Sequence, residues 1–195
     1  MFSRKGGKKT LGKRLYSLPA LFVLIFVAGI LSTLYFTANV PLINIAKIKN
    51  LAKQDVVVKS QVDTAISMLE VLNQKVKTGA LSLASAKKLG ADLLRGMTYG
   101  ADKQGYFFAD TTEGVNVVML GDKTIEGRNR LNDSLHDVYY VKELIKAGQQ
   151  ADGGFITYWY PKRGETNPKE KRAYAMEYKP FGWVVGSGYY LEDVK

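Results

Sequence analysis

The sequence GYFFADTTEGVNVVML at residues 105–120 is typical of two strands joined by a tight turn. Its outer parts, Tyr106 to Asp110 and Val115 to Leu120, are rich in the aromatic and β-branched residues that favour strands. The four residues between them, TTEG, are turn formers that end in glycine. The stretch therefore predicts a β-hairpin, and with it a sheet in this half of the chain.

Three more strands are predicted after this hairpin, at Phe155–Tyr160, Arg172–Tyr178 and Trp183–Tyr190, because the same residue types recur there between turn residues. The segment Pro161–Lys171 is polar and rich in turn residues, so it is predicted to be a long hairpin loop. A short helix is expected ahead of these strands, with one apolar face made by Val138, Val141, Leu144 and Ile145.

Two helices are predicted before the hairpin, over residues 42–78 and 82–98, with a break at Pro41 ahead of the first. Apolar residues recur along the first helix at steps of three and four, which is heptad spacing, and Asp55 alone interrupts them. This apolar seam can pack within the domain or join two copies of the chain as a homodimer. Two helices followed by about five antiparallel strands over residues 105–194 predict an α+β fold of one layer on another.

An uncharged, apolar run extends from Leu15 to Ala46, and its centre at 18–36 would measure about 29 Å as a helix, close to the roughly 30 Å of a bilayer core. We therefore expect a transmembrane helix over residues 15–38. Six basic residues in the tail at 1–14 would keep the N-terminus cytoplasmic, so that residues 39–195 form a periplasmic or extracellular domain on the inner (cytoplasmic) membrane. A cleaved signal peptide is the alternative, but the apolar run is long for one and no small-x-small pattern follows it.

The formal net charge of +10 is concentrated near the N-terminus. Residues 1–54 contain nine of the 28 basic residues and none of the 18 acidic ones, so the rest of the chain carries 19 basic against 18 acidic residues. A domain this close to neutral lacks the cationic face that nucleic-acid binding requires, and no nucleic-acid partner is expected. The chain has no cysteine, which excludes disulfides, thiolate nucleophiles and cysteine-bound metals.

The sequence offers little for catalysis, so neither an enzyme nor a bound cofactor is expected. It contains a single histidine, His136, near Asp133 and Asp137, and no cluster of metal-ligating residues at usable spacing. A lone histidine in a loop is more often an exposed polar group than a proton-transfer residue. The run GSG at 186–188 lacks the further glycine and helix of a phosphate-binding loop and is expected to let two backbones pass closely.

A row of aromatic and basic side chains is predicted on one face of two neighbouring strands, because side chains two residues apart along a strand point the same way. The row is Ile156, Tyr158, Tyr160 and Lys162, faced by Tyr174, Met176 and Tyr178. Phenols beside an ammonium group on an apolar wall suit a small carboxylate, whose oxygens need charge-assisted hydrogen bonds. The alternative is that these tyrosines are ordinary core and rim residues.

Four segments together resemble a single Cache domain, the PAS-like extracellular sensor of bacterial methyl-accepting chemotaxis proteins and some sensor histidine kinases. They are GYFFADTTEGVNVVML at 105–120, EGRNRLNDS at 126–134, GGFITYWYPK at 153–162 and KPFGWVVGSGYYLEDV at 179–194. The resemblance covers about residues 42–194 and implies a pocket between the sheet and its covering loops. Short carboxylates such as acetate, propionate, lactate or pyruvate are the implied ligands, so we expect a sensor of a C2 to C4 organic acid in chemotaxis or signal transduction.

The resemblance also implies which residues contact that ligand. They are Tyr106, Phe108, Asp110, Tyr158, Tyr160, Lys162 and Tyr174, and Arg128 is expected to face the carboxylate together with Lys162. Many relatives carry a histidine-proline pair near the end of the second strand, where this chain has Met119-Leu120-Gly121. This difference leaves the identity of the ligand open.

The sequence ends at Lys195, directly after the last predicted strand, without the output module that chemoreceptors carry. We expect either a truncated receptor or a stand-alone sensor that passes its signal to a membrane signalling partner. Two other functions remain open. One is a membrane-anchored partner-binding protein without a small-molecule ligand, and the other is an anchored hydrolase, which would need a nucleophile with a base or a metal beside it.

Overall fold

The computed structural model describes residues 18–120 and 122–194, without the side chains of residues 18–21 and 36–44. The expected basic tail at 1–14 therefore lies outside the described residues, as do the first residues of the expected transmembrane helix. Within the part of the chain that is described, no helix combines the length and the apolar character needed to cross a membrane.

The first helix, α1 (Leu18–Lys77), belongs to two compact units, Met1–Ala46 and Lys47–Lys195. It continues through Pro41, where the sequence predicted a break, so that prediction is wrong. A proline inside a helix removes one backbone hydrogen bond and costs roughly 3 kcal/mol, which many regular turns on either side can offset.

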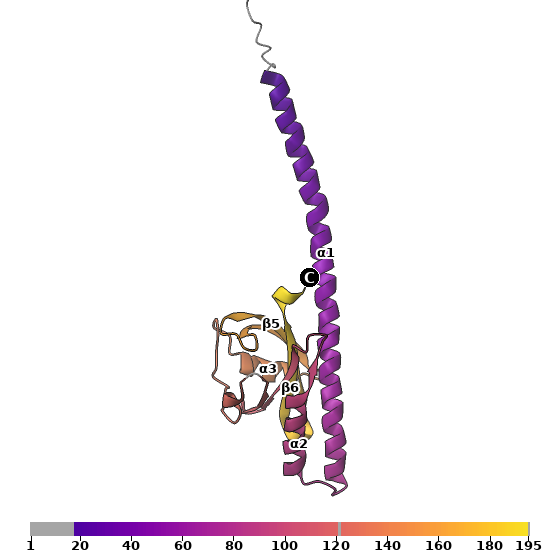
Figure 1. Ribbon diagram of the computed structural model, residues 1–195, viewed down its shortest axis with the longest axis vertical. Helices are drawn as coiled ribbons and strands as arrows, with labels where there is room; N and C mark the ends of the chain where they lie inside the picture. The colour runs from indigo at the N-terminus through magenta and orange to yellow at the C-terminus, as the bar shows by residue number, and fades with distance from the viewer. Residues whose placement is uncertain (1–17, 121, 195) are drawn as a thin grey trace, which may run out of the picture. The chain divides into compact units, whose positions relative to one another are not determined.

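The unit Lys47–Lys195 surrounds a six-stranded antiparallel sheet with helices (Figure 1). Besides the last part of α1, its helices are α2 (Leu83–Gly96) and α3 (Tyr140–Gly148), with the 3-10 turns η1 (Lys123–Ile125), η2 (Lys179–Phe181) and η3 (Leu191–Asp193). The strands are β1 (Thr98–Tyr99), β2 (Gly105–Thr111), β3 (Asn116–Met119), β4 (Gly154–Pro161), β5 (Pro168–Tyr178) and β6 (Trp183–Tyr190). Their order is β1-β2-β6-β5-β4, with β3 paired to β2.

The predicted α+β fold is confirmed, with six strands in the described residues instead of about five. The predicted hairpin is present, and its register places Phe108 opposite Met119. The second helix begins as expected, because the Ser85 amide donates a hydrogen bond of 3.1 Å to the Ser82 hydroxyl and so satisfies a free donor of the first turn.

The strand β5 begins earlier than predicted. Its first residues, Pro168–Lys171, pair with Tyr158–Pro161 of β4, although their composition suggested a loop. Backbone hydrogen bonds to a neighbouring strand outweigh the local preference of polar residues. The correction changes the site, because Lys171 lies in the middle of the sheet and not in a solvent-exposed turn.

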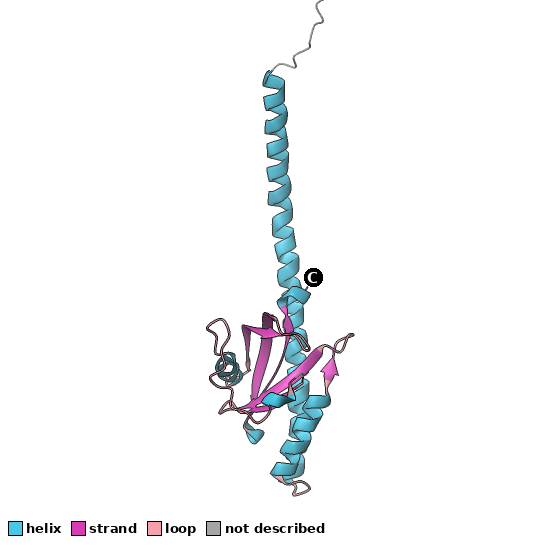
Figure 2. Ribbon diagram, turned by 60° about the vertical axis from the view of Figure 1, so that its left-hand side comes forward, coloured by secondary structure: helices cyan, strands magenta, loops and turns pink. Residues whose placement is uncertain are grey.

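The two faces of the sheet are covered by different helices, as Figures 1 and 2 show. Successive side chains of a strand alternate between faces, so Phe107 and Phe108 enter different hydrophobic clusters. The cluster on the side of α1 and α2 includes Leu69, Leu94, Phe107, Phe181 and Val185. The cluster on the side of α3 includes Tyr106, Phe108, Val141, Leu144, Tyr158 and Ala173.

The apolar seam of α1 packs within the domain from Val58 onward. Its members are almost completely buried there: Val58, Val62, Ala65, Leu69 and Leu72. Ile48, nearer the N-terminus on the same predicted seam, is exposed. The intradomain interpretation of the seam is therefore correct for its C-terminal half.

The glycines at 186 and 188 bring strands into close contact, as predicted. A Cβ atom at Gly186 would collide with the ring of Phe108, and one at Gly188 would lie 2.5 Å from the Arg172 carbonyl oxygen. Gly186 therefore makes room for the Phe108 ring of β2, and Gly188 for the backbone of β5.

Candidate ligand-binding site

The centre of the candidate site is Lys171 on β5, whose side chain is only 1 % exposed. The strand register pairs it with Tyr158 of β4 on one side and with Tyr190 of β6 on the other. Paired residues of neighbouring strands point to the same face of a sheet, so these three side chains gather on the face that α3 covers.

Aromatic rings enclose the Lys171 ammonium group. Its Nζ donates a hydrogen bond of 2.8 Å to the Tyr106 hydroxyl and lies 4.4 Å from the centre of that ring. The rings of Phe108, Tyr160 and Tyr190 lie 5.3 to 5.6 Å away. Such contacts stabilise a cation only in part, by about 2 kcal/mol each when they are shielded from water.

Among the described residues, no carboxylate lies within ion-pair distance of Lys171. Burying an unmatched charge costs several kcal/mol, and evolution rarely keeps one without a partner. An anion that reached this ammonium group would therefore be strongly stabilised.

The phenols around Lys171 differ in their electrostatic surroundings. Burial alone would raise the pKa of Tyr106, but the Lys171 ammonium outweighs it and lowers the pKa below its usual value. Burial raises the pKa of Tyr158 well above that value, so its phenol stays neutral. No hydrogen bond joins the Tyr158 hydroxyl to a described residue, although its ring stacks on Tyr140. This hydroxyl is a free donor inside the enclosure.

A second buried cation, Arg130, lies at the other side of the tyrosines and is only 4 % exposed. Its Nη2 donates to the hydroxyls of Tyr140 at 2.9 Å and Tyr160 at 3.5 Å, and its Nε donates to Asp133 at 3.0 Å. Burial raises the pKa of Tyr160 to about 12, against the opposing effect of Arg130. Unlike Lys171, this guanidinium group already has an acidic partner.

A buried acid, Asp110 on β2, completes the polar part of this face. Its Oδ1 accepts a hydrogen bond of 2.9 Å from Asn116 Nδ2. Burial raises its pKa to about 6, while Asn116 and the nearby Arg130 act in the opposite direction. The Oδ1 atom of Asn116 is buried without a hydrogen-bond partner, so this corner has capacity for a further donor.

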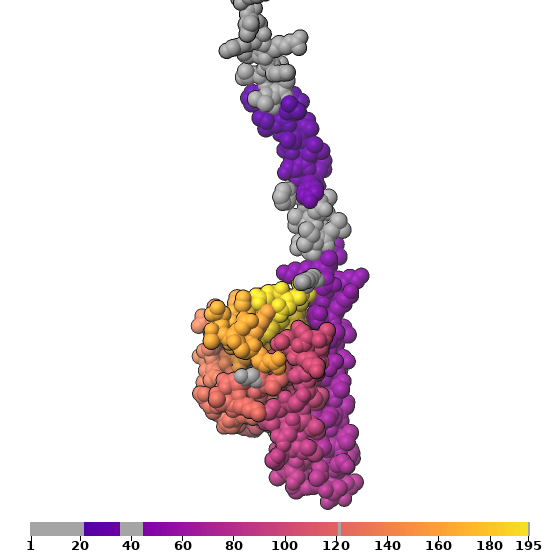
Figure 3. Space-filling view, in the orientation of Figure 1, coloured from indigo at the N-terminus to yellow at the C-terminus, as the bar shows by residue number. Residues whose placement is uncertain are grey.

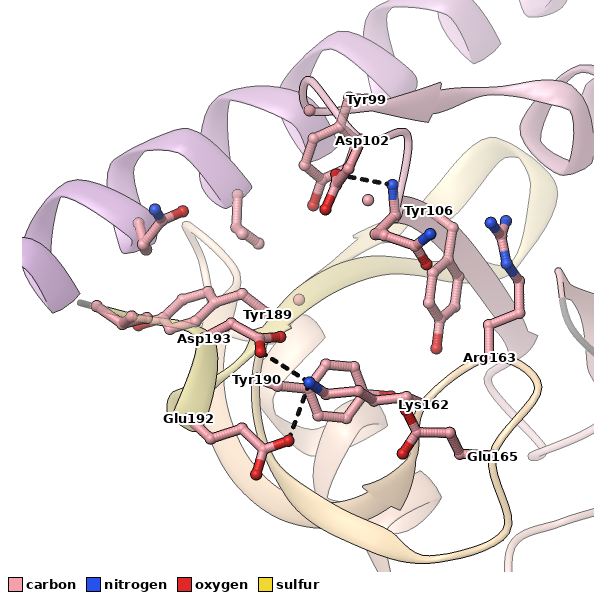
Figure 4. Close-up of a pocket in the computed structure, with 17 residues that line it drawn as sticks. Tyr99, Asp102, Tyr106, Lys162, Arg163, Glu165, Tyr189, Tyr190, Glu192 and Asp193 are labelled. Carbon is pink, nitrogen blue, oxygen red and sulfur yellow. Dashed lines mark hydrogen bonds and ion pairs between the residues drawn. The ribbon is translucent and has the colours of Figure 1, made fainter.

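Two hollows at the surface border this enclosure, with volumes of about 710 and 290 Å³. Tyr106 lines both, and so do Lys162, Arg163 and Glu165 of the β4–β5 turn. Figure 4 shows Tyr106 and Tyr190 at the wall of the larger hollow. The centres of the same two rings lie 4.4 and 5.6 Å from the Lys171 Nζ atom. A small ligand would reach the ammonium group by passing these two rings.

The predicted carboxylate anchor, Lys162, lies at the mouth of these hollows and is already paired. Its Nζ lies 2.9 Å from a Glu192 oxygen and 2.7 Å from an Asp193 oxygen (Figure 4). These two ion pairs join the β4–β5 turn to the segment that follows β6, and the two regions meet on the surface in Figure 3. Two carboxylates already satisfy this lysine, so it has less need of a third than Lys171 has.

The predicted position of Tyr174 opposite Tyr158 is wrong. The register pairs Tyr158 with Lys171 and Phe155 with Tyr174, so Tyr174 points to the other face, toward α1. Its hydroxyl accepts a hydrogen bond of 2.9 Å from Lys59. Met176 and Tyr178 share that face for the same reason, and the latter donates to Glu70 on α1.

The structure brings only some of the other residues that were predicted to contact the ligand to one place. Five of them share the α3 face of the sheet: Tyr106, Phe108, Asp110, Tyr158 and Tyr160. Arg128 is exposed, and the inward-pointing arginine is Arg130, two residues later in the same loop. Sequence reasoning missed Lys171, although it lies two and four residues before Ala173 and Ala175, and this even spacing places it on the same face as these two buried alanines.

The single histidine does not belong to this group of buried side chains. His136 is exposed, and its ring stacks on Trp159 with the centres 4.9 Å apart. Within the described residues, no group of histidine and acidic side chains could hold a metal ion.

Comparisons with known proteins place this fold among sensor domains. The family model of single Cache domain 2 matches residues 51–195, so the chain belongs to that family. The resemblance noted in the sequence is confirmed.

Known relatives and structures agree with this family. The methyl-accepting chemotaxis protein McpP of Pseudomonas putida is 27 % identical over 135 residues, which are 69 % of this chain and 24 % of McpP. The periplasmic sensor domain of a chemotaxis protein has a TM-score of 0.68 and 26 % identity, covering 72 % of this chain and 96 % of that domain. A Cache chemosensory domain described for carboxylic acid recognition has a TM-score of 0.66 and 23 % identity, covering 71 % and 93 %.

The chain thus spans about a quarter of the length of McpP. The part that it shares with these proteins is a sensor domain.

Proposed function

We propose that this protein is an extracytoplasmic sensor that binds a C2 to C4 organic acid, with Lys171 as the anchor of the carboxylate. The observation that carries the proposal is the buried ammonium group without an acidic partner among the described residues. The similarity to a Cache domain described for carboxylic acid recognition supports the same class of ligand.

The side chains around Lys171 fit the chemistry of a short carboxylate. One carboxylate oxygen would accept a hydrogen bond from the ammonium group, and the other would accept one from the free hydroxyl of Tyr158. Phe108 and Met119 offer an apolar wall for the carbon atoms. A neutral ligand of the same size would leave the buried charge unmatched and should bind far more weakly.

We propose that the apolar run ahead of the sensor anchors it in the membrane, with the N-terminus cytoplasmic. Its large apolar side chains that are described are exposed, including Phe22, Ile25, Phe26 and Leu31. Water is a poor solvent for such a surface, while lipid is a good one. The basic residues ahead of it support the orientation.

The signal would leave the sensor through α1, toward the membrane and a signalling partner. A homodimer through this helix would have to use its outer side, because the seam from Val58 onward is buried within the domain. Ile48, Val56 and Val71 are exposed apolar residues on α1 that are available for such a contact.

Thermal unfolding of the purified full chain against short carboxylates, amino acids and sugars tests the ligand class. A ligand at a hundred times its dissociation constant adds about 2.7 kcal/mol to the free energy of unfolding. For a domain of this size the melting temperature should rise by about 5 to 10 °C. We expect the rise with monocarboxylates only, and we expect it to disappear in Lys171→Met.

A flat response across all classes would favour the second candidate, an anchored protein that binds a partner and no small ligand. The exposed apolar side of α1 is the observation that supports this candidate. Turnover of generic ester or phosphate substrates would instead indicate a hydrolase, which the described residues do not suggest.

A further inference from the structure

The face of the sheet opposite Lys171 carries an ion pair at the same step of the strand register. On the ligand face, Lys171 of β5 is paired with Tyr190 of β6. On the opposite face, which α1 covers, the adjacent residues Arg172 and Tyr189 are paired in the same way. Successive side chains of a strand point to opposite faces, so the two pairs lie back to back across one layer of backbone.

Arg172 and Tyr189 both hold one residue of α1, Asp55. The guanidinium group binds the carboxylate through two parallel contacts, Nε to Oδ1 and Nη2 to Oδ2, each 2.8 Å long. The Tyr189 hydroxyl donates to the Asp55 Oδ1 atom at 2.9 Å. Burial and the adjacent carboxylate raise the pKa of Tyr189, so this hydroxyl keeps its proton. A bidentate arginine–carboxylate pair fixes both distance and angle between its elements.

Packing alone does not account for Asp55 at this position. It interrupts the apolar seam that continues from Val58, and an apolar side chain there would bury more surface without the cost of removing charges from water. Partly buried ion pairs contribute little to stability, and in some proteins they specify one arrangement of the elements that they join. The clasp formed by Asp55, Arg172 and Tyr189 therefore fixes how α1 lies against β5 and β6.

We propose that this clasp couples the state of the Lys171 site to α1. The proposal rests on the proposed function for the nature of the input, an anion that neutralises Lys171. Lys171 and Arg172 share a peptide unit, and so do Tyr189 and Tyr190. When Lys171 and Tyr190 adjust to an anion, the shared backbone carries Arg172 and Tyr189 with it, and the two-point contact to Asp55 tightens or loosens. Asp55, Arg172 and Tyr189 are thus positioning residues that do not touch the ligand.

A coupled element must respond differently in the two states of the site, and the coupling must act in both directions. Lys171→Met removes the charge with a side chain of similar length, so it imitates neutralisation without any ligand. Asp55→Asn keeps the shape of the clasp and removes its charge. Asp63→Asn is the matched control, because Asp63 is on the same helix and pairs with Lys59 of that helix.

The experiment measures hydrogen exchange of the amides of residues 51–59 in the purified full chain. We expect Lys171→Met to change their exchange rates by about fivefold. The change should vanish in the Asp55→Asn background and persist in the Asp63→Asn background. Arg172→Lys, which keeps the positive charge but loses the two-point contact, should also abolish it and provides a second variant if Asp55→Asn unfolds.

Two results would overturn the proposed coupling between the Lys171 site and α1. One is an equal response to Lys171→Met with and without Asp55, and the other is no response in the wild-type background. The ligand proposal is judged separately by adding sodium acetate, propionate or pyruvate to the wild type. If none of these acids binds while Lys171 and Asp55 remain coupled, the proposed ligand class is wrong and the proposed coupling is retained.

Discussion

Two lysines on the same hairpin, Lys162 and Lys171, show how position decides the role of a charge. Lys162, at the turn, is half-buried and lies between the carboxylates of Glu192 and Asp193. Lys171, inside the sheet, has only phenols and aromatic rings around it. A surface ion pair is screened by water and contributes about 0 to 1 kcal/mol, whereas a buried unmatched charge leaves a large electrostatic demand for an anion. The buried lysine is therefore the better anchor for a ligand.

The largest expected effect is that of Lys171→Met on ligand binding. Removal of one partner of a buried charge pair should weaken binding of a monocarboxylate by about 1000-fold, or roughly 4 kcal/mol. The free energy of unfolding without ligand should stay the same or rise, because the buried charge is gone. Titration calorimetry and chemical denaturation measure the two quantities. If Lys171→Met still binds the monocarboxylate with unchanged affinity, Lys171 is not the anchor.

The second expected effect is a pH dependence of stability caused by the buried acid Asp110, which differs in its pKa from the acids at the surface. Burial raises the pKa of Asp110 from 3.8 to about 6, whereas the lysines next to Glu192 lower the pKa of that exposed acid. A raised carboxyl pKa means that the folded state binds more protons between pH 4 and pH 6, so stability falls as the pH rises through this window.

We expect the wild type to lose about 2 to 3 kcal/mol relative to Asp110→Asn between pH 4 and pH 7. Denaturation curves of both proteins across this range test the sign, because other titrating groups cancel in the difference. A difference that is independent of pH would mean that folding does not raise the pKa of the Asp110 carboxyl.

A smaller effect is expected from Tyr158→Phe, which removes only the free hydroxyl inside the enclosure. The loss of one hydrogen bond to a charged ligand should weaken binding about tenfold, or roughly 1.4 kcal/mol. The melting temperature without ligand should hardly change, because this hydroxyl has no partner in the described residues. Tyr178→Phe is the control, because the Tyr178 hydroxyl binds Glu70 on the opposite face of the sheet, and its effect on affinity should be smaller.

The smallest effect on binding is expected from Lys162→Ala. Its ammonium group is satisfied by Glu192 and Asp193, so affinity for a monocarboxylate should change by less than about threefold. Binding rates can change more than affinity, because this residue lines the mouth of the hollows. A loss of affinity as large as that of Lys171→Met would restore Lys162 as the anchor.

Much of the fold followed from local sequence patterns. The hairpin at 105–120, the helix at Tyr140–Gly148 and the capped start of α2 agree with the structure, because turn residues, periodicity and caps act over a few residues. The continuation of α1 through Pro41 and the early start of β5 were missed. In both cases regular structure on either side overrides the preference of single residues.

The sequence by itself determined the α+β class, the family and the position of Tyr158 and Tyr160 on one face of the sheet. Only the tertiary structure decided which cation faces those tyrosines. The reason is the register of β4 against β5. A pairing shifted by one residue would move Lys171 to the face that α1 covers and Tyr174 to the face that α3 covers. Register depends on how the turn at 162–167 closes and on which side chains the rest of the fold buries on each face, and no local pattern of lysine and tyrosine residues specifies it.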